Sequence, residues 1–496
     1  MSGFRRLIKN SIANIINGFS NVIMGIIISP FLLSTLSIDE FSVWNLMLQV
    51  GTFFSLLGYC GQISVSRYIT IAKANNSFSE ENKTIKYALQ ICLISVIISI
   101  TILLILLICY SFKDIFNDID YKKIKNVEPS FFLVSLSFIL SLIPSVFIGY
   151  FTGIERNDIP ATINLFSKVI IGTGIIISSS YGIFYMSFLY FLLNLLSYFF
   201  IYLFYNKTRS SKVNFPIHKK ISFTLKEYIL YYFSIFVFNF SMFLITGFNS
   251  ILVGKYAFNE FAFYSLAMTL TSAAISFLNA GLTPILQPII KYSQSNQEKN
   301  ITDLVYNLTI MFLLISIATI IVMPFIGHFI LTLWISDEIS NKTYNIFLCL
   351  LSVNLFRMIG APLGLVYVAN AKQHKIMHLP FIEGSISATL TFFLLSHYGM
   401  YAVPISMICA MIIIFLIYNF NLLKILTVNP YHREFNIIFL LMPSVMVYIL
   451  YTSIHDKIII YNSILTNIIA IILLLIILVK IIKNITNIKQ LLENSY

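Results

Sequence analysis

The stretch from Asp39 to Gly61, DEFSVWNLMLQVGTFFSLLGYCG, has a counterpart 220 residues later, NEFAFYSLAMTLTSAAISFLNAG from Asn259 to Gly281. In both stretches a Glu-Phe pair is followed by a glycine twenty residues after the phenylalanine. A second pair of matching turns, Tyr181-Gly182 and Tyr398-Gly399, repeats with an offset of 217 residues. Two independent pairs with nearly one offset indicate duplication of a unit of six membrane spans. An even number of spans makes the two halves parallel, related by an axis along the membrane normal.

The composition places this chain in a membrane. Of its 496 residues, 58% are hydrophobic and 10% are charged, whereas soluble proteins carry roughly 25% charged residues. Apolar runs of about 20 residues, each long enough to cross a hydrocarbon core of roughly 30 Å, recur from one end to the other. The five cysteines lie in apolar segments without paired spacing, so neither a disulfide framework nor a zinc site is predicted.

We therefore predict an all-α integral membrane protein of about fourteen transmembrane helices. Two six-helix lobes would be joined by a basic linker and followed by two extra helices. The predicted spans lie at 11–36, 41–72, 86–111, 129–152, 159–180, 182–205, 226–253, 257–290, 303–333, 344–370, 376–397, 399–423, 435–453 and 458–482. The predicted domains are an N-terminal lobe at 1–205, a cytoplasmic linker at 206–225, a C-terminal lobe at 226–424, and the last two helices with a tail at 425–496.

The distribution of lysine and arginine predicts the orientation. With the N-terminus inside, the cytoplasmic loops and both termini collect 22 of the 32 basic residues, and the opposite face holds 7. Because cytoplasmic loops of membrane proteins are enriched in Lys and Arg, both termini are predicted to be cytoplasmic. The same bias explains the net charge of +12 without a nucleic-acid partner.

Three basic side chains, Arg67, Lys168 and Arg357, lie inside predicted spans, with one acid, Glu383, in comparable surroundings. A charge in the hydrocarbon zone costs at least about 2.5–3.5 kcal/mol, so such residues normally face protein or water and have a function. Arg357 and Lys168 lie near the middle of their spans, whereas Arg67 lies nearer one end and could reach the headgroups. The net positive sign predicts an anionic substrate, and the alternative for each residue is a structural ion pair.

Two more polar residues are candidates. Gln287 takes the place of Arg67 under the 220-residue offset and lies between Pro284 and Pro288, which predicts a kink or break that could expose backbone groups to substrate. Glu383 is either a protonatable group that couples transport to a proton gradient or a fixed partner for a basic residue. No catalytic, metal or cofactor site is predicted.

These residues resemble the polysaccharide exporters of the multidrug/oligosaccharidyl-lipid/polysaccharide (MOP) flippase superfamily, O-antigen (Wzx-type) flippases especially. The resemblance covers essentially the whole chain, and it is carried by Pro30-Phe31-Leu32-Leu33, Glu40-Phe41, Gly61 leading into Arg67-Tyr68-Ile69, residues 254–264, and Ile382-Glu383 running on to Tyr398-Gly399. One departure is Asn249, where exporters of this type often have an acid in the seventh span.

The resemblance implies a transporter of the bacterial inner membrane, in which two lobes surround a cavity that opens alternately to each side. Its implied substrate is an undecaprenyl-diphosphate-linked O-antigen oligosaccharide, moved from the cytoplasmic to the periplasmic leaflet. The implied partners are membrane lipids and the polymerase and chain-length regulator of the same pathway.

Three alternatives stay open. A lipid II flippase shares the diphosphate carrier, and a multidrug exporter of the same superfamily would need acids rather than bases in its cavity. A membrane polymerase or glycosyltransferase is the least favoured, because the longest external loop, 112–128, has no acid-base or metal constellation. We therefore expect a protein that is not an enzyme.

Overall fold

The computed structural model describes residues 25–74, 77–109, 124–210, 223–282, 285–295, 297–369, 378–425 and 464–493. Within these ranges the chain is helical and contains no strand. Ten helical segments in them are long and apolar enough to cross a membrane. The chain is thus a multi-pass membrane protein, as predicted. Predicted span thirteen, at 435–453, lies outside the described residues, and span one is described only from residue 25.

The chain divides into two compact units, Met1–Ala262 and Phe263–Tyr496. The first unit contains a helical segment, Gly25–Thr35, and the start of α11. Its other helices are α2 (Ile38–Ala74), α3 (Phe78–Cys109), α5 (Val127–Leu140), α6 (Leu142–Gly153), α7 (Asp158–Ser179), α8 (Ile183–Ser210), α9 (Leu225–Phe243), the π-helix η1 (Leu244–Phe248) and α10 (Asn249–Tyr256). Packing thus groups α9 to α10 with the first unit, whereas the lobes predicted from the repeat begin the second half at 226. The compact units reflect which helices pack together, whereas the predicted lobes reflect the repeat in the sequence. The lobes at 1–205 and 226–424 therefore stay a prediction.

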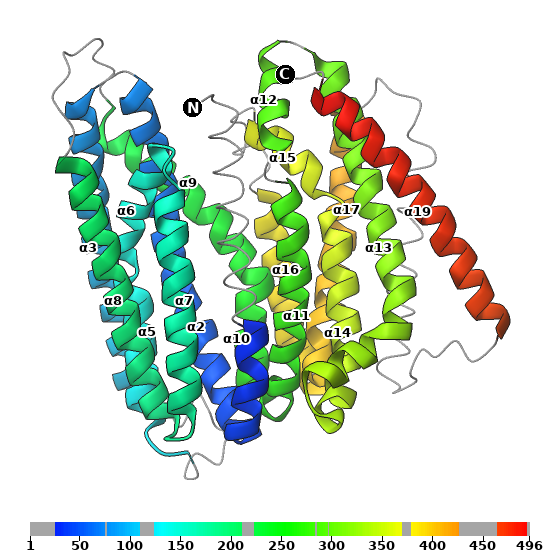
Figure 1. The fold of residues 1–496 in the computed structure, drawn as a ribbon, viewed down its shortest axis with the longest axis horizontal. Helices are drawn as coiled ribbons and strands as arrows, with labels where there is room; N and C mark the ends of the chain where they lie inside the picture. The colour runs from blue at the N-terminus through cyan, green and yellow to red at the C-terminus, as the bar shows by residue number, and fades with distance from the viewer. Residues whose placement is uncertain are drawn as a thin grey trace. The chain divides into compact units, whose positions relative to one another are not determined.

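In the first unit α2 is the central helix and packs against α3, α5, α6 and α9, while α7 pairs with α8 (Figure 1). Trp44 of α2 is 2% exposed and meets the ring of Tyr190 edge-on at 5.8 Å between centroids. The approach of α6 to α2 is so close that a Cβ on Gly149 would lie 2.6 Å from the carbonyl oxygen of Gln62. A small residue is therefore required at this crossing, as is typical of helix pairs in membranes.

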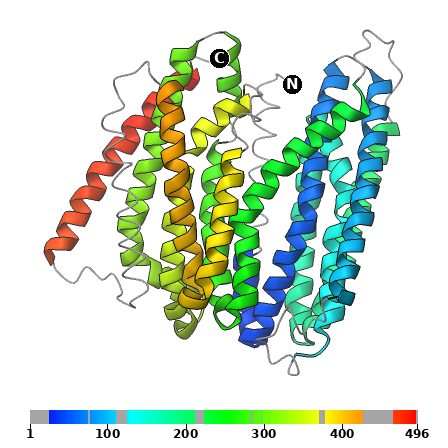
Figure 2. The ribbon, with the colours of Figure 1, turned by 180° about the vertical axis from the view of Figure 1, so that it is seen from behind.

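The second unit holds most of α11 and seven further elements. These elements are α12 (Leu286–Gln294), α13 (Glu298–Trp334), α14 (Asp337–Met358), α15 (Ala361–Ala369), α16 (His378–Tyr398), α17 (Ala402–Ile425) and α19 (Ile464–Glu493), with a 3-10 turn η4 (Gly399–Tyr401) before α17. Figure 2 shows α16 (yellow) alongside α17 (orange), and α19 (red) lies against α13.

Helix boundaries follow the duplication predicted from the sequence. The starts of α2 and α11, of α3 and α13, and of α7 and α16 are each 220 residues apart, and α8 and α17 start 219 apart. The predicted Tyr-Gly turns connect α7 to α8 and α16 to α17. Gly182 has φ 98° and Gly399 has φ 51°, positive values that glycine adopts at low cost.

The repeated Glu-Phe pair marks the start of a helix in both halves. At the start of α2, Glu40 accepts a hydrogen bond from the backbone N–H of Ser37 at 3.0 Å, and the Ser37 hydroxyl accepts one from the N–H of Glu40 at 3.2 Å. This reciprocal capping box satisfies two backbone donors that the helix leaves free. The next residue packs inward, since Phe41 is 2% and Phe261 0% exposed.

Two described spans are interrupted near a proline. In span eight α11 ends at Leu282 and α12 begins at Leu286, but Pro284 between them lies outside the described residues, so the break predicted at that proline stays a prediction. Span ten divides at Ile359-Gly360, just before Pro362, and span four divides at Ser141, three residues before Pro144. The last two interruptions were not predicted, although the prolines are visible in the sequence.

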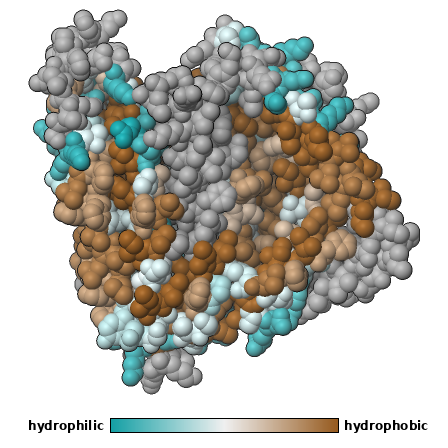
Figure 3. Space-filling view, in the orientation of Figure 1, coloured by the Kyte–Doolittle hydropathy of each residue, from teal (hydrophilic) through white to brown (hydrophobic). Residues whose placement is uncertain are grey.

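Apolar residues cover the middle of each unit on the face shown in Figure 3, and hydrophilic residues gather toward the helix ends. On α7 the exposed side chains include Phe166 at 64% and Ile177 at 67%. Large exposed apolar side chains along a spanning helix are expected where the surrounding solvent is lipid.

Candidate functional site

An ion pair joins two of the predicted site residues in the second unit. The Nε of Arg357 on α14 donates to Oε1 of Glu383 on α16 at 2.7 Å. The two side chains are 19% and 13% exposed, so the pair is largely shielded from solvent. The positive charge of Arg357 and the negative charge of Glu383 compensate each other, so the pair as a whole is neutral.

The position of Arg357 in its helix explains why the pair is placed there. Arg357 lies in the last turn of α14, where a cation interacts favourably with the helix dipole. Its carbonyl accepts a hydrogen bond from the N–H of Gly360 at 3.2 Å, which tightens the final turn before α15 begins. The ion pair therefore ties the interruption of span ten to α16.

Lys168 lies on α7 in the first unit, ten residues after the start of the helix, and is partly buried. Among the described residues it has neither an ion pair nor a hydrogen bond. At helical spacing it shares a face with Gly172, Ile175 and Ser179, which are all buried. The Ser179 hydroxyl accepts a hydrogen bond from Thr35 at 2.9 Å, so this face points toward protein rather than lipid.

Arg67 lies on α2 in the first unit with its side chain exposed. Its guanidinium carbon is 4.3 Å from the centroid of the Tyr231 ring of α9, a cation–π contact. Beside it, Tyr68 packs on Phe223 with centroids 4.3 Å apart and on Tyr228 with centroids 5.2 Å apart. These aromatic contacts hold the start of α9 against α2, so Arg67 has a structural contact besides any contact with substrate.

Gln287 is the second residue of α12, directly after the interruption of span eight. The helix α12 packs on α15, so the segments that follow the two breaks in this unit contact each other. The hydroxyl of Tyr292 on α12 donates to the carbonyl of Leu491 on α19, and the Tyr292 side chain is 2% exposed. The helix α12 is thus held by α15 and by α19.

Of the predicted site residues, the structure brings one pair together, Arg357 with Glu383. Sequence reasoning missed the π-helix η1, which directly precedes Asn249. The Phe243 ring packs on Gly247 so closely that a Cβ there would lie 2.3 Å from the ring. Asn249 is fully buried and its amide donates to the Ile245 carbonyl at 2.8 Å, so this asparagine serves the helix.

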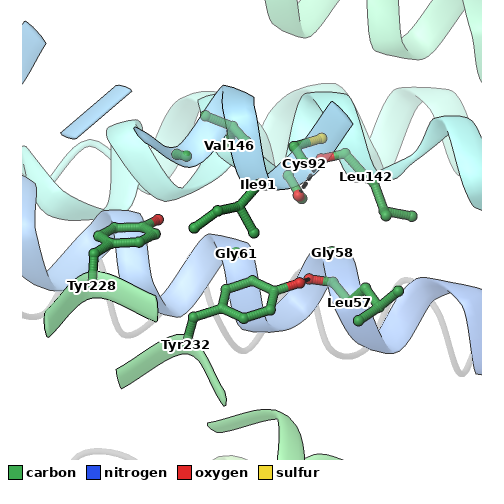
Figure 4. Close-up of a pocket in the computed structure, with 11 residues that line it drawn as sticks. Leu57, Gly58, Gly61, Ile91, Cys92, Leu142, Val146, Tyr228 and Tyr232 are labelled. Carbon is green, nitrogen blue, oxygen red and sulfur yellow. Dashed lines mark hydrogen bonds between the residues drawn. The ribbon is translucent and has the colours of Figure 1, made fainter. Parts of the chain in front are cut away.

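A narrow cavity lies between α2, α3, α6 and α9 in the first unit (Figure 4). It is lined by Leu57, Gly58, Gly61, Ala88, Ile91, Cys92, Leu142, Ser145, Val146, Tyr228 and Tyr232. The Tyr232 hydroxyl donates to the Leu57 carbonyl at 2.8 Å, while the buried Tyr228 hydroxyl has no hydrogen-bond partner among the described residues. The cavity has room for about one water molecule and is therefore too small for a sugar.

No family model matches this sequence, and no curated protein matches it. Solved structures of membrane transporters do match its fold. The fold is similar to the lipid II flippase MurJ in an inward closed conformation, with a TM-score of 0.66 at 15% identity over 95% of this chain and 98% of that chain. It is also similar to an inward-facing multidrug resistance MATE family transporter of the MOP superfamily, with a TM-score of 0.59 at 15% identity over 88% of this chain and 96% of that chain.

A third similar structure is a MOP superfamily transporter from Pyrococcus furiosus, with a TM-score of 0.50 at 14% identity over 90% of this chain and 96% of that chain. At such identities the similarity shows the fold. The chain is an all-α membrane protein with the fold of MOP superfamily transporters.

Proposed function

We propose that this multi-pass protein, which has the fold of MOP superfamily transporters, is a flippase for lipid-linked oligosaccharides. Its substrate is an undecaprenyl-diphosphate-linked O-antigen or related polysaccharide repeat unit. The unit moves from the cytoplasmic to the periplasmic leaflet of a bacterial inner membrane by alternating access, and both termini are cytoplasmic.

One observation carries the proposal: among the described residues inside predicted spans, basic side chains still outnumber acidic ones after the Arg357–Glu383 pair is set aside. Arg357 and Glu383 form an ion pair, whereas Lys168 has no ion pair among the described residues. A basic side chain retained inside a span is suited to an anionic cargo. A diphosphate headgroup is such a cargo, and it crosses hydrocarbon only when it is shielded. The wider predicted binding set, Arg357, Lys168, Arg67 and Gln287, stays a prediction.

The nearest rival function is a lipid II flippase. One structurally similar protein carries that name, and lipid II shares the diphosphate carrier of O-antigen intermediates. The charge pattern is the same for both substrates because they differ in their sugars. Only a functional test separates them.

The charge pattern disfavours a multidrug exporter for cationic compounds. Such a cavity needs acids, and Glu383 is paired with Arg357. In the described part of the first unit every acid lies in the first turn of a helix or in a turn between helices. An uncompensated acid at mid-membrane depth is therefore missing from those ranges.

Complementation tests the proposal. In a bacterium whose O-antigen flippase is deleted, expression of this chain with its matching glycosyltransferases should restore long-chain surface O-antigen on a polyacrylamide gel. In a second strain depleted of its lipid II flippase, the chain should fail to restore cell-wall synthesis. Rescue of the second strain alone would replace the proposed substrate with lipid II, and rescue of neither strain at normal protein levels would contradict the flippase function. Partner polymerase and chain-length regulator proteins would then be sought by co-purification from the first strain.

A further inference from the structure

The helical span Leu225–Tyr256 packs differently from its counterpart in the repeat. It runs through α9, η1 and α10 as one continuous span. The repeat relates it to the first span, whose Thr35 donates to Ser179 of α7 within the same half of the sequence. The span Leu225–Tyr256 packs instead on α2, which belongs to the other half. Duplication alone therefore does not decide with which helices this span moves.

The start of this span is fixed by its own sequence. Thr224 and Glu227 form a capping box, in which each side chain accepts a hydrogen bond from the backbone N–H of the other residue, at 3.3 and 3.0 Å. Phe223, the residue before the cap, packs on Tyr228 with ring centroids 6.3 Å apart. This hydrophobic staple sets the angle at which the chain enters the helix. Both rings also pack on Tyr68 of α2, so the cap is attached to α2.

Contacts with α2 continue through the middle of the span. The Tyr232 hydroxyl donates to the Leu57 carbonyl at 2.8 Å. Two turns later, the amide nitrogen of Asn239 lies 4.0 Å from the sulfur of Cys60, which is fully buried. Because hydrogen bonds and close packing, rather than burial from water, hold helices together in lipid, these contacts stabilise the pair.

The other end of the span is attached to the same helix. The rings of Phe243 and Phe53 are 5.6 Å apart between centroids. Gly254 approaches Leu46 so closely that a Cβ on the glycine would lie 2.6 Å from the leucine side chain. Leu46 and Tyr68 are 22 residues apart on α2, a rise of about 33 Å, and the hydrocarbon core is roughly 30 Å thick. The contact therefore covers the whole thickness of the membrane.

A contact of this length is suited to one moving body rather than to a gate. In alternating access, the two bodies of a transporter close on one side of the membrane while they open on the other. The contact with α2 is closed at both ends of the span. The narrow cavity beside Tyr232 has room for about one water molecule, so the cargo does not pass between these helices.

We infer that α9, η1 and α10 form one rigid body with α2 and stay attached to the first unit throughout the transport cycle. The boundary that moves then lies after Tyr256 and not at the predicted linker 206–225. The inference rests on the alternating access of the proposed function and goes beyond it, because it assigns the seventh span to one of the two moving bodies.

An engineered disulfide tests the inference. In a protein whose other cysteines are replaced by alanine, Asn239→Cys places a thiol within reach of Cys60, and oxidation links α9 to α2. Proteoliposomes report flipping of a fluorescent undecaprenyl-diphosphate-linked disaccharide, and mass spectrometry verifies the bridge. The bridged protein should flip the lipid within about twofold of the reduced protein, because the two helices do not separate. The matched control, Asn239→Cys with Cys60→Ala, receives the same oxidant and cannot form the bridge.

The outcomes separate the inference from the proposed function. If the bridged protein loses flipping and reduction restores it, α9 separates from α2 during transport. The inference is then overturned, while the flippase function survives. If the wild-type protein does not flip this lipid, the proposed function fails, and the inference is decided by distances that need no transport assay.

Spin labels supply those distances. One label pair, Ile71→Cys with Leu230→Cys, joins exposed positions of α2 and α9, and a second pair joins Leu230→Cys to Phe381→Cys on α16. The distances are measured in nanodiscs with and without undecaprenyl diphosphate. The first pair should keep one unchanged distance, and the second should shift or show two distances. A change in the first pair, or no change in the second, would overturn the inference.

Discussion

The helices α7 and α16 occupy the same place in the two repeats, since their first residues are 220 apart, yet they carry opposite charges. Lys168 of α7 corresponds to Ala388 of α16, and Glu383 of α16 corresponds to Ile163 of α7. Glu383 has a basic partner on a neighbouring helix, whereas Lys168 has no ion pair among the described residues. Duplication thus kept the helical framework while the buried charges diverged.

This difference separates two uses of a charge in a membrane. In the second unit the charges cancel and stabilise the packing around an interrupted span. In the first unit Lys168 has no ion pair among the described residues, which is unfavourable for stability and is typical of residues that serve function. Loss of one partner of the Arg357–Glu383 pair should therefore lower the stability of the second unit more than loss of Lys168 lowers the stability of the first unit.

The largest effect should come from breaking the pair. Arg357→Leu leaves Glu383 as a buried, uncompensated carboxylate, and we expect a loss of about 3–5 kcal/mol in stability. The double variant Arg357→Leu with Glu383→Leu should recover most of that loss, because no charge is left behind. Thermal unfolding in detergent, followed by fluorescence-detected size exclusion, measures both. Equal losses in the single and double variants would show that the two side chains are not coupled.

The next effect concerns the central helix of the first unit. Under the repeat offset Ser64 of α2 corresponds to Pro284, which lies in the sequence between the end of α11 and the start of α12, while α2 runs on without a break. Ser64 is fully buried, so Ser64→Pro should cost about 3 kcal/mol or more by removing a backbone hydrogen bond and clashing with the preceding turn. Unfolding temperature and circular dichroism report the loss, with Ser64→Ala as the control. A well-folded Ser64→Pro protein would mean that both halves tolerate the same interruption.

A smaller effect should appear where α6 crosses α2. Gly149→Ala places a Cβ 2.6 Å from the backbone oxygen of Gln62, and we expect a loss of about 1–3 kcal/mol from overpacking. Gly364 on α15 is the matched control, because nothing lies within 4 Å of a Cβ added there. The ranking of the two alanine variants in one thermal assay checks the prediction, and similar stability of both would contradict a tight crossing specific to the first unit.

The smallest change in stability should follow removal of Lys168. Lys168→Leu deletes a basic group that has no ion pair in the described part of the chain, so stability should stay within about 1 kcal/mol of the wild type or rise. The same detergent assay that detects the loss in Arg357→Leu measures it. A large loss in Lys168→Leu would point to an unrecognised structural partner.

Much of the framework could be predicted from the residues. The matching Glu-Phe pairs and the two Tyr-Gly turns predicted a duplication that the helix boundaries follow, because helix caps and positive-φ glycines are local features. The prolines predicted a break in span eight, and Pro284 lies between the end of α11 and the start of α12. The interruption of span ten at Gly360 was equally visible, but a proline alone does not show whether a membrane helix bends or ends.

The candidate site was harder to predict for a physical reason. In a soluble helix the apolar stripe shows which side is buried, but lipid tails are as apolar as leucine, so both sides of α7 look alike in the sequence. Whether Lys168 faces protein or lipid therefore depends on neighbours that the local pattern does not encode. The π-helix before Asn249 was missed for a related reason, since it depends on how the Phe243 ring packs on Gly247.

By itself the sequence determined that this chain crosses a membrane many times, that its two halves are duplicated, and that three cations and one acid lie within its spans. Those conclusions follow from hydrophobicity and charge, whose costs in hydrocarbon do not depend on which partner is nearby. Only the tertiary structure decided that Glu383 pairs with Arg357. An ion pair depends on the distance between side chains on different helices, and packing sets that distance.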